Sequence, residues 1–219
     1  MLWELLSTNL LWTQGLTLLL FIIAGWILSF LIYRPLSYLL LFFFLFCVWF
    51  FRNPQRACPE LQSDKSVIVS PADGKIVDIT FGDVGNGFAQ KVSIFLSVFD
   101  AHVNWIPFDG TVSHTAYHEG SFTLAFLPKS STLNERNDVF IKTNNGKRLM
   151  VRQIAGTIAR RICCWVHAGD MVKACDTFGM IRFGSRVELF LPEDVSLEVG
   201  IGQMIVGGQT VIGRWQSSW

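Results

Sequence analysis

The stretch Met180-Ile-Arg-Phe-Gly-Ser-Arg-Val-Glu-Leu-Phe-Leu-Pro192 contains two short apolar runs on either side of a Gly-Ser pair. Runs of this length, bounded by turn residues, are typical of β-strands. Similar β-branched and aromatic runs recur from Ser66 onward, at residues 67–69, 75–80, 91–98, 139–142, 149–154, 158–165 and 187–191. Their close spacing, with no helical period beyond about two turns, predicts an all-β sandwich or barrel rather than βαβ units.

A weak internal repeat refines this prediction. Gly169-Asp-Met-Val-Lys-Ala-Cys-Asp-Thr177 matches Gly202-Gln-Met-Ile-Val-Gly-Gly-Gln-Thr210 at an offset of 33 residues. Each copy has the pattern of a turn, a short strand, a second turn and a returning strand. Small residues allow such tight hairpins, which are common in lipoyl- and biotinyl-like sandwiches. We therefore expect a mainly β, pseudo-symmetric sandwich or barrel with lipoyl-like hairpins.

The first 51 residues are much more apolar than the rest, since Glu4 and Arg34 are their only charged side chains. Residues 16–33 and 36–51 form uncharged runs of 18 and 16 residues. As helices they would be roughly 27 and 24 Å long, against a bilayer core of about 30 Å. We expect an N-terminal α-helical membrane anchor over residues 1–53, either as a hairpin of two short spans or as a shallow re-entrant hairpin.

The orientation of this anchor follows from the basic residues near its ends. Arg52, Arg56 and Lys65 follow the second run, and nothing basic precedes Arg34. Because cytoplasmic flanks are enriched in Lys and Arg, the β-rich domain over residues 54–219 is expected on the cytoplasmic side of the inner membrane.

Composition excludes several other functions. The formal net charge is +1, and no basic tract with interleaved aromatic residues occurs, so nucleic acid is not an expected partner. No cysteine pair has CxxC or zinc-ligand spacing, so we expect no metal site and reduced thiols. The five cysteines are Cys47, Cys58, Cys163, Cys164 and Cys175.

A Gly-Ser bond can cleave itself when the serine hydroxyl attacks the preceding carbonyl and a nearby base takes the proton. Glycine removes the Cβ that would hinder attack. Elimination from the resulting ester leaves dehydroalanine, and hydrolysis then gives a pyruvoyl group and ammonia. The chain has two such pairs, Gly120-Ser121 and Gly184-Ser185. The strand-like flanks favour the second pair, where cleavage would give chains 1–184 and 185–219.

Seven stretches of the chain resemble, in order, the small form of the phosphatidylserine decarboxylase family. The resemblance covers nearly the whole chain and implies conversion of phosphatidylserine in the membrane to phosphatidylethanolamine and CO₂. It also implies a pyruvoyl cofactor derived from Ser185. The stretches are Phe50-Phe-Arg-Asn-Pro54, Ser70-Pro-Ala-Asp-Gly74, Phe95-Leu-Ser-Val-Phe-Asp-Ala-His-Val-Asn104, Tyr117-His-Glu-Gly-Ser-Phe122, Asn134-Glu-Arg-Asn137, Gln153-Ile-Ala-Gly-Thr-Ile-Ala-Arg-Arg161 and Phe183-Gly-Ser-Arg186.

The resemblance further implies an active site made of Ser185, His102 and Asp73. Asp73 corresponds to an aspartate implicated in processing and in orienting a histidine. His102 is our candidate general acid and base, since a neutral imidazole near pH 7 suits both roles. Larger members carry a second histidine three residues further on, where this chain has Trp105. His102 must therefore serve more than one proton transfer, or another group is recruited.

Other cationic side chains are candidates for binding the lipid headgroup. An arginine fork can bind phosphate or carboxylate oxygens in a bidentate manner. On this basis we predict His118, Arg136, Arg161 and Arg186 as substrate-binding residues, although each could equally belong to a turn or to a solvated surface.

Two alternatives stay open from the sequence. One is a membrane-anchored lipoyl-like adaptor or carrier without enzymatic activity, for which Lys173 is the candidate modifiable lysine. The other is the same chemistry on a different phosphoserine lipid, archaetidylserine. The expected partners are the phospholipid substrate and the alpha and beta chains of one proenzyme, with a homodimer left open.

Overall fold

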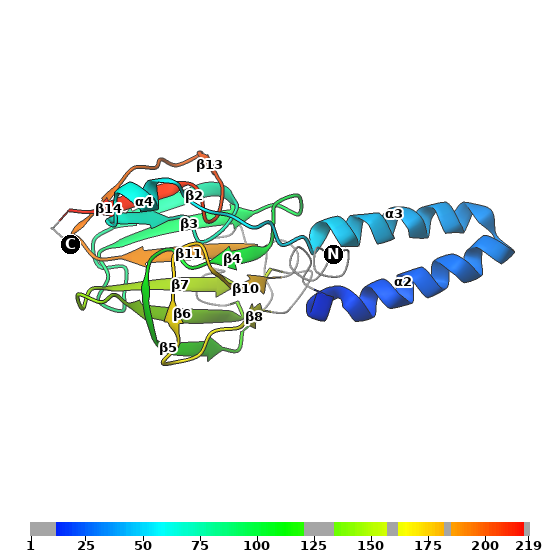
Figure 1. Cartoon of the computed structure of the whole chain (residues 1–219), viewed down its shortest axis with the longest axis horizontal. Helices are drawn as coiled ribbons and strands as arrows, with labels where there is room; N and C mark the ends of the chain where they lie inside the picture. The colour runs from blue at the N-terminus through cyan, green and yellow to red at the C-terminus, as the bar shows by residue number, and fades with distance from the viewer. Residues whose placement is uncertain (1–11, 121–133, 157–161, 182–184, 217–219) are drawn as a thin grey trace. The chain divides into compact units, whose positions relative to one another are not determined.

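A computed structural model of the chain describes residues 12–120, 134–156, 162–181 and 185–216 (Figure 1). The chain divides into two compact units, Met1–Gln55 and Arg56–Trp219.

The described part of the first unit consists of two helices, α2 (Trp12–Ile32) and α3 (Arg34–Phe50). Pro35 lies in the first turn of α3, where its fixed φ suits a helix and its missing N–H costs no hydrogen bond. The helices lie side by side (Figure 1), and a Cβ added at Gly25 would be 3.7 Å from Leu40 Cδ1.

Both helices expose large apolar side chains. Phe21, Leu31 and Tyr38 are 74%, 78% and 69% exposed. Within the described residues, no helix meets the combined length and hydropathy expected of a membrane-crossing segment. The predicted attachment of this unit to a membrane stays a prediction.

The second unit is mainly β, as predicted, and its largest sheet among the described residues has eight antiparallel strands that curl across the unit (Figure 1). In spatial order these are β13 (Met204–Ile205), β2 (Gly74–Phe81), β3 (Gln90–Leu96), β11 (Ser185–Leu191), β7 (Arg148–Ile154), β6 (Arg136–Lys142), β5 (Gly110–His118) and β9 (Met171–Val172).

Two smaller antiparallel sheets and one short helix complete the described part of this unit. The first sheet contains β1 (Val67–Val69), β14 (Val211–Trp215) and β12 (Val195–Leu197). The second contains β4 (Val103–Trp105), β10 (Thr177–Ile181) and β8 (Ile162–Cys164), and the helix is α4 (Glu60–Ser63).

The internal repeat supplies the two edges of the eight-stranded sheet. The first copy contains β9 and the second contains β13, and these are the outermost strands on opposite sides. Both copies begin with a glycine in the left-handed region, with φ of 96° at Gly169 and 90° at Gly202. Glycine adopts this conformation without a Cβ clash, which confirms the predicted turns. The finer lipoyl-like likeness stays a prediction.

Strand β11 is buried on both faces because it lies in the interior of the sheet between β3 and β7. Successive side chains of a strand point to opposite faces. Val187 and Leu189 belong to the main hydrophobic core, whereas Phe190 packs in a second cluster with Phe88 and Met150. The odd-numbered positions of β11 therefore face the main core, and the even-numbered positions face the other side.

Candidate active site

Ser185 is the first residue of β11 and is fully buried. By the alternation of the strand, its side chain shares the core-facing side with Val187 and Leu189. Its hydroxyl oxygen is inaccessible and has no hydrogen-bond partner among the described residues. Buried hydroxyls are usually hydrogen-bonded, so an orphan of this kind needs a functional explanation. Gly184, the other half of the predicted cleavage site, lies outside the described residues.

Two strand pairings bring His102 and Ser185 to the same corner of the unit. Leu96, the last residue of β3, pairs with Ser185. Val103, the first residue of β4, pairs with Met180 in β10. His102 lies in the segment that joins β3 to β4. This segment begins beside β11 and ends beside β10, the two strands that flank the Gly-Ser pair in the sequence.

His102 is fully buried and is fixed by hydrogen bonds of its backbone and ring. Its carbonyl oxygen accepts a hydrogen bond from the Ile181 N–H at 3.1 Å. Its Nδ1 lies 3.0 Å from the carbonyl oxygen of Asp100. A carbonyl can only accept, so Nδ1 carries a proton. In the neutral ring Nε2 then has no proton and is the basic nitrogen. A general base requires such an unprotonated nitrogen.

Asp73 is buried and is held by three parts of the chain. Its Oδ1 accepts a hydrogen bond from the Gly207 N–H at 2.8 Å, and its Oδ2 accepts one from the Ala101 N–H at 3.2 Å. Arg56 donates to both carboxylate oxygens, with Nη2 at 2.9 Å from Oδ2. Because Ala101 directly precedes His102, these contacts fix Asp73 to the backbone beside the histidine.

Trp105, at the position where the resemblance implies a second histidine in larger members, is fully buried against the cation that holds Asp73. The Arg56 guanidinium lies 4.5 Å from the centroid of its ring. On another side, a Cβ added at Gly207 would be only 2.4 Å from Trp105 Cε3. The indole therefore fills the space beside Asp73 and Arg56.

A chain of buried amides, which were not among the site residues predicted from the sequence, lies on the same face of the sheet as Ser185. Gln153 Nε2 donates to Asn104 Oδ1 at 2.8 Å, and Asn137 Nδ2 donates to Gln153 Oε1 at 3.1 Å. Gln153 pairs with Val187 in β11. Each amide comes from a different one of the seven quoted stretches, and this recurrence was the signal that could have identified them.

Three predicted headgroup residues lie on the opposite face of the sheet from the Ser185 side chain. His118, Arg136 and Arg186 occupy one row across β5, β6, β7 and β11, with Ile154 between the two arginines. Arg186 is only 3% exposed, and its Nε lies 3.2 Å from Glu188 Oε1. The sheet thus separates Arg186 from Ser185. The headgroup roles stay predictions, and Arg161 lies outside the described residues.

The next row on that face is a buried ion network. Arg152 donates from Nε to Asp138 Oδ1 at 2.6 Å and from Nη2 to Oδ2 at 2.8 Å. Its Nη1 also lies 3.9 Å from Glu188 Oε2. Burial opposes the charge of Arg152, but its hydrogen bond and charge pairing with Asp138 prevail and raise its pKa.

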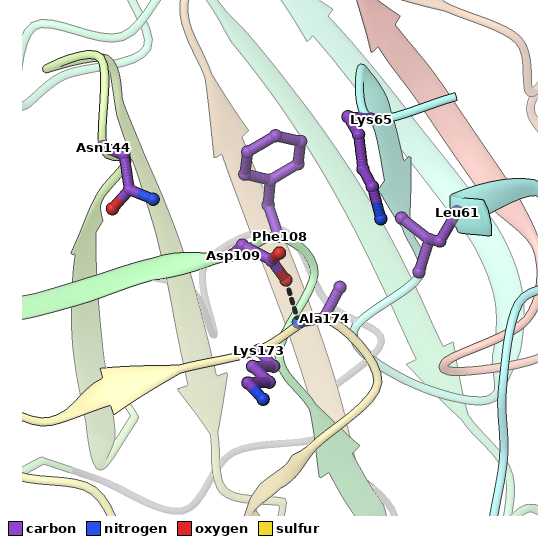
Figure 2. A pocket seen from close by; sticks show the side chains of 7 residues that line it. All are labelled: Leu61, Lys65, Phe108, Asp109, Asn144, Lys173 and Ala174. Carbon is purple, nitrogen blue, oxygen red and sulfur yellow. Dashed lines mark hydrogen bonds between the residues drawn. The ribbon is translucent and has the colours of Figure 1, made fainter. Parts of the chain in front are cut away.

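A cavity of about 400 Å³ lies at the other end of the sheet, where β5 begins (Figure 2). Its polar lining comes from Lys65, Asp109, Asn144 and Lys173. Asp109 Oδ1 accepts a hydrogen bond from the Ala174 N–H at 2.7 Å. Of the predicted active-site residues that the structure describes, none lines it. Since His118 at the far end of β5 shares the row of Arg186, this cavity and Ser185 lie at opposite ends of the strands.

The sequence of this chain is similar to those of known proteins over the region that contains these motifs. The sequence profile of the family described as phosphatidylserine decarboxylase matches residues 43–213. A relative from Syntrophus aciditrophicus is 46% identical over 174 residues, covering 78% of this chain and 80% of the relative. A relative from Carboxydothermus hydrogenoformans is 47% identical over 183 residues, covering 82% and 84%.

A third relative, from Porphyromonas gingivalis, is 44% identical over 177 residues and covers 80% of both chains. All three relatives bear the name phosphatidylserine decarboxylase proenzyme. The matched region includes Asp73, His102 and Ser185. With a profile match over most of its length and relatives at this level of identity, the chain belongs to the phosphatidylserine decarboxylase family.

Proposed function

We propose that this chain is a proenzyme that cleaves itself between Gly184 and Ser185 and then decarboxylates phosphatidylserine to phosphatidylethanolamine. Membership of the family and the names of the relatives support the reaction. The observation that carries the proposal is the buried Ser185 hydroxyl without a hydrogen-bond partner among the described residues, at the start of an interior strand. A hydroxyl that is shielded from solvent and is not engaged in another hydrogen bond is suited to attack the carbonyl that precedes it.

Self-cleavage would begin when Ser185 Oγ attacks the Gly184 carbonyl and gives its proton to a base. His102 is our candidate for this base. The N→O acyl shift gives an ester and a new amino group at residue 185. Loss of the α-proton then expels the Gly184 carboxylate and leaves dehydroalanine. Its imine tautomer takes up one water and releases ammonia, which yields the pyruvoyl group at the start of chain 185–219.

The residues around Ser185 suit a pyruvoyl group at this position. Ser185 and His102 are fully buried, so bulk water would be kept from a reactive ketone at residue 185. When formed, the group supplies a carbonyl that can take up the substrate amine and act as an electron sink as CO₂ leaves. The chain itself would then orient the carboxylate, exclude water and deliver a proton to the substrate carbon. His102 is the proposed proton donor, and Asp73 fixes the backbone beside it.

We further propose that the N-terminal helices attach the enzyme to the inner membrane, with the catalytic unit on the cytoplasmic side. A diacyl lipid hardly leaves a bilayer, so the enzyme must work at its surface. The exposed apolar side chains of α2 and α3 support this attachment. So does the Arg52 guanidinium 3.9 Å from the centroid of the Trp49 ring, a pairing suited to the headgroup region.

Purified protein mixed with phosphatidylserine vesicles tests the proposed reaction. We expect release of CO₂ and formation of phosphatidylethanolamine, abolished by Ser185→Ala and unaffected by Lys173→Ala. Archaetidylserine vesicles, assayed in parallel, would identify the lipid backbone that the enzyme prefers. Activity that survives Ser185→Ala would overturn the proposal, and activity that needs Lys173 would support a carrier instead.

A further inference from the structure

Arg56 is the cationic partner of the Asp73 carboxylate. Both terminal nitrogens of its guanidinium donate to that carboxylate. Nη1 also donates to the Gly207 carbonyl oxygen at 2.8 Å. In turn the Gly207 N–H donates to Asp73 Oδ1 at 2.8 Å. Arg56, Asp73 and Gly207 therefore form a closed set of mutual hydrogen bonds.

Trp105 restricts the guanidinium in this position. The Arg56 Cζ lies 4.5 Å from the centroid of the Trp105 ring, and the side chains of Arg56 and Asp73 are each only 12% exposed. A planar guanidinium is suited both to a bidentate carboxylate pair and to stacking on an aromatic ring, which an ammonium cannot reproduce. The contacts with Asp73 and Trp105 therefore fix the orientation of the Arg56 guanidinium and do not only neutralise the charge of Asp73.

We infer that Arg56 is a positioning residue for the proposed reaction, acting through Asp73 on the segment that carries His102. Asp73 Oδ2 accepts the Ala101 N–H, and Ala101 is joined directly to His102. Arg56 thereby determines where the carboxylate holds that backbone. Trp105, which stacks on Arg56, stands at the sequence position where the family resemblance implies a second histidine in larger members. This inference rests on the proposed function.

Substitutions of Arg56 test the inference through the rate of proenzyme cleavage. We expect Arg56→Gln to slow cleavage by roughly 100-fold, since displacement of a catalytic group by about 1 Å can cost that much. Arg56→Lys should restore cleavage in part, because it keeps the charge and loses the fork. In Arg56→Gln protein that has been cleaved, kcat should fall while KM stays near the wild-type value.

A double variant separates positioning through Asp73 from a general effect on the fold. If Arg56 acts through Asp73, Arg56→Gln combined with Asp73→Asn should cleave no more slowly than Asp73→Asn alone. Arg214→Gln is the matched control, because Arg214 also bridges carboxylates, with Nε 2.6 Å from Glu198 and Nη1 2.6 Å from Asp64. It lies outside the proposed site and should cleave at the wild-type rate.

Thermal unfolding of the same variants in a Ser185→Ala background shows whether each remains folded at the assay temperature. If Arg56→Gln does not, Arg56→Lys takes its place in the cycle with Asp73→Asn. Wild-type cleavage by Arg56→Gln, or effects of the two substitutions that multiply, would overturn the inference and leave the proposed function intact. A wild-type chain that does not cleave would overturn the proposed function itself.

Discussion

Ser185 and Leu96 face each other across the junction of β11 and β3, so the first residue after the proposed cut is already held in the sheet. Strand β11 continues along β3 as far as Leu191 and along β7 from Arg186 to Phe190. The chain downstream of the cut therefore starts in the interior of the eight-stranded sheet and not at an edge.

The first prediction is that the fragment 185–219 stays bound after cleavage. It contributes β11, β12, β13 and β14, which pair with strands of the other chain or with one another. The two fragments should elute together in size-exclusion chromatography under native conditions and separate only in denaturant. Release of the small fragment without denaturant would contradict this arrangement.

The second prediction concerns Arg152, which lies between Asp138 and Glu188. Replacing it with methionine would leave two buried carboxylates without their shared cation. Breaking a buried ion pair in this way typically costs about 3–5 kcal/mol. Urea unfolding of uncleavable Ser185→Ala protein should show a loss of this order for Arg152→Met. The exposed Arg148→Met control should change the free energy of unfolding by less than about 0.5 kcal/mol.

The third prediction concerns Gly207, whose backbone N–H holds Asp73. Gly207→Ala would place a Cβ 2.4 Å from Trp105 Cε3 and 2.9 Å from the Ala72 carbonyl carbon. The indole cannot retreat without disturbing Arg56, so we expect about 1–3 kcal/mol of destabilisation and slower cleavage. Gly200→Ala meets no atom within 4 Å and serves as control. Equal behaviour of the two variants would argue against close packing around Trp105.

The fourth prediction concerns the thiols of Cys164 and Cys175. Burial raises the pKa of both thiols above the ordinary value. A raised pKa lowers the thiolate fraction at neutral pH, and the thiolate is the reactive form. Iodoacetamide should therefore modify these residues more slowly than a free cysteine at pH 7, with the rate rising as the pH approaches and passes the raised pKa. Rapid modification at neutral pH would contradict the described burial.

The sequence predicted the β-rich unit because its apolar runs alternate with turn residues, and the strands on either side of the Gly-Ser pair are present as β10 and β11. The turn glycines of the repeat were also predictable, since Gly169 and Gly202 require a backbone conformation that other residues avoid. That the two copies would lie at opposite edges of one sheet was not predictable, because strand order depends on pairing between distant segments.

The site was less predictable than the fold. Arg186 was predicted as a headgroup contact, and it directly follows Ser185 in the sequence. In a strand, however, adjacent side chains point to opposite faces. Arg186 accordingly pairs with Glu188 on the face away from Ser185. In the sequence, Arg56 is recognisable only as a basic residue that follows the second apolar run, since its pairing with Asp73 depends on how the two segments meet in the folded unit.

Intact mass spectrometry of the purified protein shows whether the bond between Gly184 and Ser185 has been cut. We expect two chains, residues 1–184 and 185–219, with the small chain lighter by one ammonia than the same peptide beginning with serine. Borohydride should reduce its blocked N-terminus, and Ser185→Ala protein should give one intact chain. A single unmodified wild-type chain that nevertheless decarboxylates phosphatidylserine would show that the reaction needs neither the cut nor a pyruvoyl group.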